Sequence, residues 1–160
     1  MADIQDLPLW VRTLLRAYPW RKIDPVPCTP LRKPLRESRV ALVTTAGLVV
    51  PGQQPFDQEV RGGDTSYRVI PSDAEVQSLE EHHRSESFDH AGIEKDRNLA
   101  FPLDRLRELA ALGEIGSVAP RHLSFMGSIT APGRLTKQSA PEAAQLLVAD
   151  EVEVALLFPV

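Results

Sequence analysis

The 160-residue sequence lacks several features that define whole classes of protein. It contains a single cysteine, Cys28, so no disulfide can form within the chain. No apolar run approaches the roughly 20 residues that a membrane-spanning helix needs. The first ten residues are acidic and contain no apolar signal core, unlike a secretory signal peptide. These absences predict a cytoplasmic protein with no membrane segment.

The sequence also lacks an excess of basic charge. Lys and Arg total 18 against 22 Asp and Glu, which gives a net charge of −4. Because nucleic-acid-binding domains usually carry a basic surface, we expect no nucleic-acid partner. Hydrophobic residues make up 42% of the chain, which is enough for one domain with a substantial core.

The amino-terminal residues 1–37 differ in composition from the rest. Apolar residues repeat with helical spacing between Leu7 and Leu15, which predicts a helix with Asp6 as its cap. Five prolines between residues 19 and 34 then predict an extended, basic connector. Cys28 lies in this connector without a neighbouring base to activate it, so we assign it no redox role.

Residues 38–160 are expected to form a single α/β domain, whose mainly parallel sheet is flanked by helices in Rossmann-like layers. Two helices that lead directly into strands support parallel connections. Ser139 is the expected cap of the second helix. We interpret the final run, residues 151–160, as a buried strand. The other expected elements are strands at 40–43 and 64–71, a short strand or turn at 115–120, and helices at 103–112 and 139–150.

Two polar segments stand out. Residues 82–90 contain three of the four histidines, but their spacing matches no helical metal site, so we assign no metal ligand. This segment is either a solvated loop, a substrate-binding surface or a structural polar network. Arg121 and His122 follow an apolar stretch and are either a carboxylate clamp with an acid–base group or an ordinary surface pair. Residues 62–68 form a turn or an anion cradle, and no nucleotide-binding motif is present.

Four ordered runs carry a resemblance to a known family: VALVTTAGLVVPGQQPFD, GDTSYRVIP, HRSESFDHAGIEKDRNLAFPLDRLRELAALGEIGSVAPRHLSFMGSI and ADEVEVALLFPV. They resemble the selenoprotein B family, which includes subunits of glycine, sarcosine and betaine reductases and of D-proline reductase. The resemblance extends from about residue 38 to residue 160.

This resemblance implies an oxidoreductase that acts on X–H and Y–H to form an X–Y bond, with a disulfide as acceptor. Family members carry a selenocysteine or a cysteine, followed by further thiols. A pyruvoyl group on a partner subunit forms a Schiff base with a small amine or amino-acid-like substrate. The selenolate, a better nucleophile than a thiol, then cleaves the C–N bond, and a dithiol reductant supplies the electrons.

The sequence departs from the family pattern at its end, because the redox motif of the family follows a strand like residues 151–160. Selenocysteine is encoded by UGA, which is ordinarily read as a stop. We therefore expect the full-length protein to continue with selenocysteine at or near the position after Val160, and the domain to be incomplete here. An incomplete fragment and a naturally shortened homologue are the alternatives. Little or no activity is expected of residues 1–160 alone.

Loops after neighbouring parallel strands are expected to surround that redox residue. We expect Thr44 and Thr45 to donate hydrogen bonds near it. The expected catalytic residues are His90, His122 and Arg121, as proton donors or holders of substrate charge. The rival functions are a non-catalytic subunit that docks a partner reductase component through the basic connector, and a metal-dependent hydrolase. The expected substrate-binding wall comprises His83, Arg84, Ser85, Ser87 and Asp89.

Overall fold

The computed structural model describes residues 4–18, 22–85 and 90–160, in two compact units, Met1–Pro30 and Leu31–Val160. The first unit contains a 3-10 turn, Ile4–Asp6, and helix α1, Leu9–Ala17. The cap position of α1 is Pro8, which makes no side-chain cap hydrogen bond. The expected helix is thus confirmed, but Asp6 as its cap is wrong, because Asp6 belongs to the preceding turn.

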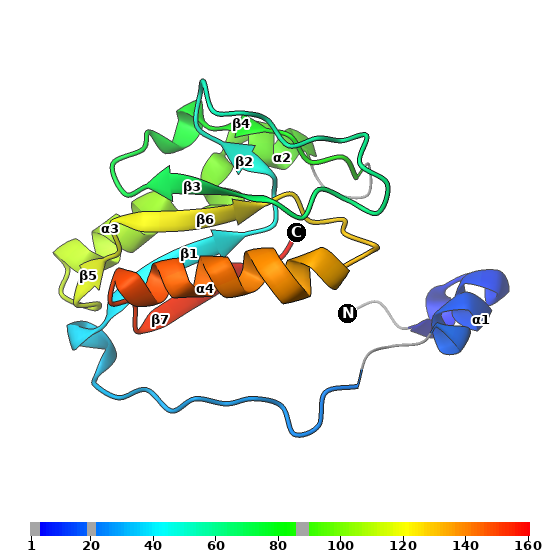
Figure 1. Cartoon of the computed structure of the whole chain (residues 1–160), viewed down its shortest axis with the longest axis horizontal. Coiled ribbons are helices and arrows are strands. Elements are labelled where there is room, and N and C mark those ends of the chain that lie inside the picture. Colours follow the sequence, from blue (N-terminus) through cyan, green and yellow to red (C-terminus); the bar gives the residue numbers. More distant parts are fainter. Residues whose placement is uncertain (1–3, 19–21, 86–89) are drawn as a thin grey trace. The chain divides into compact units, whose positions relative to one another are not determined.

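The second unit is an α/β domain built on a five-stranded sheet (Figure 1). Its central strand is β1, Arg39–Thr44. Three strands pair with β1 in parallel, namely β5 (Ser117–Val118), β6 (Arg121–Phe125) and β7 (Val154–Phe158). Strand β3, Tyr67–Pro71, pairs antiparallel with β6. The expected α/β class with a mainly parallel sheet is confirmed.

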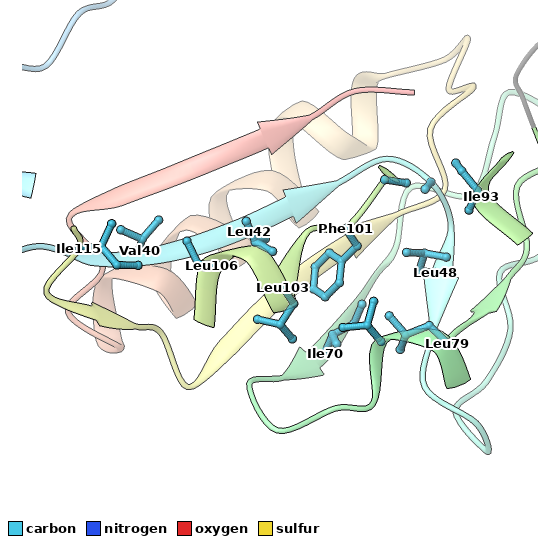
Figure 2. Packing of buried hydrophobic residues seen from close by; sticks show 13 residues of the cluster. Val40, Leu42, Leu48, Ile70, Leu79, Ile93, Phe101, Leu103, Leu106 and Ile115 are labelled. Atoms are coloured by element: carbon cyan, nitrogen blue, oxygen red, sulfur yellow. The ribbon is translucent and has the colours of Figure 1, made fainter. Parts of the chain in front are cut away.

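Helices cover the two faces of this sheet, with α3 (Leu103–Ala111) on one face and α4 (Ala140–Ala149) on the other (Figure 1). Residues alternate between the faces along β1. Val40 and Leu42 pack in the cluster that includes Leu103 (Figure 2), whereas Val43 packs in the cluster that includes Ala143. This two-sided burial explains the continuous apolar run of β1.

The remaining elements connect this framework. Helix α2, His90–Lys95, adds Ile93 to the first cluster. A second sheet pairs β2 (Leu48–Val49) with β4 (Glu80–Glu81). In the described part of the chain, no helix is long and apolar enough to span a bilayer. The short helical turns are Leu35–Glu37, Val76–Ser78, Arg97–Leu99 and the π-turn Leu135–Ser139.

The expectations about the last helix and strand have different outcomes. Ser139 stands at the N-cap position of α4, as expected, but it makes no side-chain cap hydrogen bond, because the π-helix Leu135–Ser139 precedes α4 and the backbone of Ser139 is itself helical. Strand β7 is not buried: Leu157 is 70% exposed. Within the described residues β7 pairs only with β1, so it is an edge strand of the sheet. Its apolar composition had indicated a strand inside the sheet.

Candidate functional site

Gly47 lies where β1 and β6 end, and its backbone hydrogen bonds join the segment after β1 to the end of β6 and to the segment after β4. Its N–H donates to the carbonyl of Phe125 at 2.8 Å, and its carbonyl accepts from the N–H of His82 at 2.9 Å. The backbone of Gly47 has a φ of +66°, and a Cβ atom here would lie 2.9 Å from the His83 nitrogen. The residue must therefore be glycine for the histidine segment to approach the ends of these strands.

Gly127, which follows β6, brings His83 beside Thr45. A Cβ atom on Gly127 would lie 2.7 Å from the Thr45 carbonyl oxygen and 2.9 Å from His83 Nε2. Thr45, which follows β1, and His83, which follows β4 of the second sheet, thus both approach Gly127. We call the group formed by Thr45, Glu81, His83, His90 and Gly127 the carboxyl-edge site.

Glu81 holds both histidines of this site. Its Oε1 accepts a hydrogen bond from the backbone N–H of His83 at 2.5 Å, and its Oε2 lies 2.7 Å from His90 Nδ1. The other ring nitrogen of His90 lies 2.7 Å from the carbonyl oxygen of Ser85. Because both ring nitrogens face oxygen acceptors, the doubly protonated, cationic ring satisfies this arrangement. The Glu81–His90 contact is then an ion pair.

His83 presents a hydrogen-bond donor at the centre of the site. Its Nδ1 accepts from the N–H of Ser85 at 3.1 Å, so the proton of the neutral ring is on Nε2. Burial lowers the pKa of His83 below 6.5, against an opposing effect of Glu81 and with a smaller lowering by His90. At neutral pH the ring is therefore uncharged, and its Nε2–H is a hydrogen-bond donor beside Gly127.

The end of β7 reaches the same place through Thr45. The N–H of Val160 donates to the Thr45 hydroxyl at 3.0 Å, and the N–H of Thr45 donates to the carbonyl of Phe158 at 3.1 Å. Thr44 is different, because its side chain is buried and its hydroxyl accepts from the N–H of Ala46 at 3.1 Å. Thr45, rather than Thr44, lies against the polar groups of the site.

Two more of the expected residues lie beside this site. The guanidinium of Arg84 donates to the carbonyls of Val60 and Ser128, at 3.0 and 3.3 Å, and so links two loops. Ser85 contributes through its backbone. Ser87 and Asp89 lie outside the described residues. In residues 4–18, 22–85 and 90–160, no three His, Cys, Asp or Glu side chains converge as metal ligands would.

Arg121 is not at this edge of the sheet. It begins β6, at the opposite end of the strand from Gly127, because residues 121–125 are themselves a strand rather than the loop after one. Its guanidinium binds both carboxylate oxygens of Asp150, at 2.8 and 2.5 Å. This hydrogen-bonded ion pair lowers the pKa of Asp150 and joins the start of β6 to the end of α4.

His122 is also elsewhere, inside the core. Its side chain is fully buried, lies edge-on to Phe101, and accepts the N–H of Leu42 on Nδ1 at 3.0 Å. Burial, with a smaller effect of Arg107, lowers the pKa of His122 to about 4. The ring is therefore neutral at pH 7 and occupies a structural position, which does not support the expected role as a proton donor near neutrality.

Two residues of the site, Gly127 and Glu81, and the neighbouring Gly47 were missed in the sequence. Gly47 and Gly127 each follow a strand by a few residues, which is a signal for a close backbone approach. Glu81 gave no such signal, because its role depends on pairing with two histidines that the fold places around it.

Fold and site together define an α/β domain whose polar site lies at the carboxyl ends of parallel strands, the usual place for chemistry in such sheets. The profile of the glycine/sarcosine/betaine reductase selenoprotein B family matches residues 12–159, and the chain belongs to this family. The family that the sequence resembled is thereby confirmed.

Three relatives are similar along most of the chain. The D-proline reductase subunit gamma of Acetoanaerobium sticklandii is 37% identical over 136 residues, which cover 84% of this chain and 54% of the relative. The sarcosine reductase complex component B subunit beta of Peptoclostridium acidaminophilum is 30% identical, over 88% of this chain and 32% of the relative. The glycine reductase complex component B subunit gamma of Symbiobacterium thermophilum is 28% identical over 141 residues, which cover 88% of this chain and 32% of the relative. The chain thus spans between about half and a third of these relatives, and no solved structure matches it.

Proposed function

We propose that the chain contributes the carboxyl-edge site of a dithiol-dependent reductase that cleaves a C–N bond of a small amine or amino-acid-like substrate. Family membership and the names of the relatives, which are reductase subunits, support this class. Formally, the enzyme acts on X–H and Y–H to form an X–Y bond, with a disulfide as acceptor.

The redox residue of this proposal is a selenocysteine or cysteine beyond Val160. The observation that carries it is the hydrogen bond from the Val160 N–H to the Thr45 hydroxyl, which directs the backbone after β7 toward the carboxyl-edge site. An anionic selenium or sulfur atom needs hydrogen-bond donors and positive charge nearby. The Nε2–H of His83 and the cationic ring of His90 fit that need.

When present, the selenol or thiol supplies the nucleophile, and the dithiol supplies the two electrons that reduce the C–N bond. The residues of this chain orient and stabilise the reacting groups. His83 donates from Nε2 to the anion or to the leaving nitrogen, while Glu81 and the Ser85 backbone fix the orientations of both histidine rings. Thr45 fixes the backbone at the end of β7.

A partner subunit completes the proposed enzyme. The relatives from P. acidaminophilum and S. thermophilum are named as subunits of reductase complex components, which supports assembly with other chains. We propose that the partner carries a pyruvoyl group that holds the substrate amine. A purely binding role for this chain is the competing proposal.

The DNA beyond the codon of Val160 gives the first test. An in-frame UGA or cysteine codon within a few codons, followed by further cysteine codons, is expected. The full-length protein, expressed with its partner, should then release amine from substrate only when a dithiol is supplied. Absence of both the codon and the dithiol-dependent release would refute the proposal, whereas a stable complex without release would favour the binding role.

Substitution of His83 tests the chemistry of the site in that full-length complex. His83→Gln keeps an N–H near the position of Nε2 and is expected to retain turnover within about threefold. His83→Ala removes the donor and should lower turnover at least about tenfold. His90→Ala should also lower it, because Glu81 loses its cationic partner. Equal turnover of His83→Ala and the unsubstituted enzyme would contradict the assigned donor.

A further inference from the structure

An apolar cavity of about 430 Å³ adjoins the carboxyl-edge site. It lies between α4 and strands β1, β6 and β7, on the face of the sheet opposite α3. Thr45 and Gly127 line the cavity and also lie against His83. The cavity and the site are therefore continuous.

The cavity is open because the side chains around it are small. Helix α4 presents Ala140, Ala143 and Ala144 to it, and β7 presents Ala155. Longer aliphatic side chains at these positions would fill the space between helix and sheet. Leu157, which is 70% exposed, also lines the cavity, so that it opens to solvent along the edge strand.

The walls of the cavity suit a hydrocarbon group and no charged group. Val43, Leu123, Phe125 and Leu147 form its sides, and every lining residue except Thr45 is apolar. A charged or strongly polar group here would lose its hydration without gaining a partner, whereas a hydrocarbon group would be removed from water. Polar recognition is available only at Thr45, the one polar residue of the lining, which lies where the cavity adjoins the carboxyl-edge site.

We propose that this cavity binds the apolar part of the reductase substrate. The substrate class is then an amine or amino acid that carries a hydrocarbon group of several carbons. Its nitrogen-bearing carbon lies near Thr45 and His83, and its hydrocarbon group lies between α4 and β7. Glycine has no such group and fills none of the cavity. This inference rests on the proposed function for the reaction, but the binding site can be tested without it.

Binding is measured on residues 1–160 with a series of n-alkylamines, from methylamine to hexylamine, by NMR titration. Affinity should rise about fourfold with each methylene until the cavity is filled, which is the gain expected for burial of one such group. Amide signals of Val43, Leu123 and Ala144 should shift. An affinity that does not depend on chain length, or shifts elsewhere, would overturn the proposal.

A matched pair of variants controls for nonspecific binding. Ala144 lines the cavity but is exposed, so Ala144→Leu should fold and should weaken hexylamine binding at least about tenfold by occupying the cavity. Gln145→Leu adds the same side chain to the next exposed position of α4, outside the cavity, and should bind as the unsubstituted chain does. Equal binding by Ala144→Leu and Gln145→Leu would refute the assignment.

The full-length enzyme with its partner tests the substrate class. The kcat/KM for dithiol-dependent release of ammonia should rise from glycine to 2-aminohexanoate, and Ala144→Leu should reverse that trend. Turnover of glycine with no gain from longer side chains would refute the inference and leave the proposed reaction intact. Length-dependent binding in an enzyme that reduces no substrate would refute the proposed reaction and leave the binding site intact.

Discussion

The buried His122 predicts a specific pH dependence of stability. Its pKa is lowered from 6.5 to about 4 by burial, so between these values the unfolded chain binds a proton that the folded chain does not. The contribution of the neutral His122 to the free energy of unfolding is therefore fully present above about pH 6.5, and it is lost as the pH falls toward 4. Between pH 7.5 and pH 5 this single group should lower the free energy of unfolding by about 2 kcal/mol.

Two substitutions separate this titration from packing. His122→Asn keeps an oxygen acceptor near the position of Nδ1 for the Leu42 N–H, whereas His122→Phe fills the space and leaves that N–H without a partner. Both variants lose the titrating group. When the pH is lowered from 7.5 to 5, the free energy of unfolding of each variant should therefore fall by about 2 kcal/mol less than that of the unsubstituted protein. This holds whatever the stability of the variant at pH 7.5.

Urea unfolding followed by circular dichroism at half-unit pH steps measures this difference. The comparison is made within each variant across pH, so other titrating groups cancel between proteins. If the curves of all three proteins fall in parallel from pH 7.5 to pH 5, the buried neutral imidazole is not the cause and the reasoning fails.

Further predictions concern a glycine and an ion pair. Gly127 has a φ of +68°, and a Cβ atom there would lie 2.7 and 2.9 Å from neighbouring atoms, whereas Gly113 has a φ of +73° and open space around it. Both substitutions by alanine strain the backbone, but only Gly127→Ala also creates a clash. Urea unfolding should therefore show a loss in the free energy of unfolding that is larger by at least about 1 kcal/mol for Gly127→Ala than for Gly113→Ala. Similar losses would contradict the close approach. Asp150→Asn removes the ion pair with Arg121 and should lower Tm by about 2–4 °C at pH 7. Because Arg121 lowers the pKa of Asp150 below 3.8, this difference should shrink progressively as the pH falls below 3.8, and a difference that stays constant on calorimetry over that fall would contradict the ion pair.

The elements that hydrophobic spacing predicted are those whose side chains face one environment. The apolar run of β1 is buried on both faces, and α3 buries Leu103 and Leu106 on one face, so both patterns are visible in the sequence. Strand β6 was missed because its pattern mixes environments. Its first residue pairs with Asp150, and its second is a histidine inside an apolar core.

Strand β7 shows the opposite error. Its residues are as apolar as those of β1, and the sequence indicated a buried strand. Only the pairing decides that β7 is at the edge, with Leu156 and Leu157 exposed. Composition reports the tendency of a strand to be buried, whereas its neighbours in the sheet decide whether it is.

The sequence by itself determined the α/β class, the main helices and the family, because these depend on local spacing and on ordered motifs. It also predicted Thr45, His83 and His90 as site residues, and the structure brings these three residues together. The tertiary structure alone decided that Glu81 joins the two histidines and that Gly127 brings His83 to Thr45. It alone separated Arg121 and His122 from that site, because contacts between segments far apart in the sequence, such as Arg121 with Asp150 and His122 with Leu42, form only when the sheet is assembled.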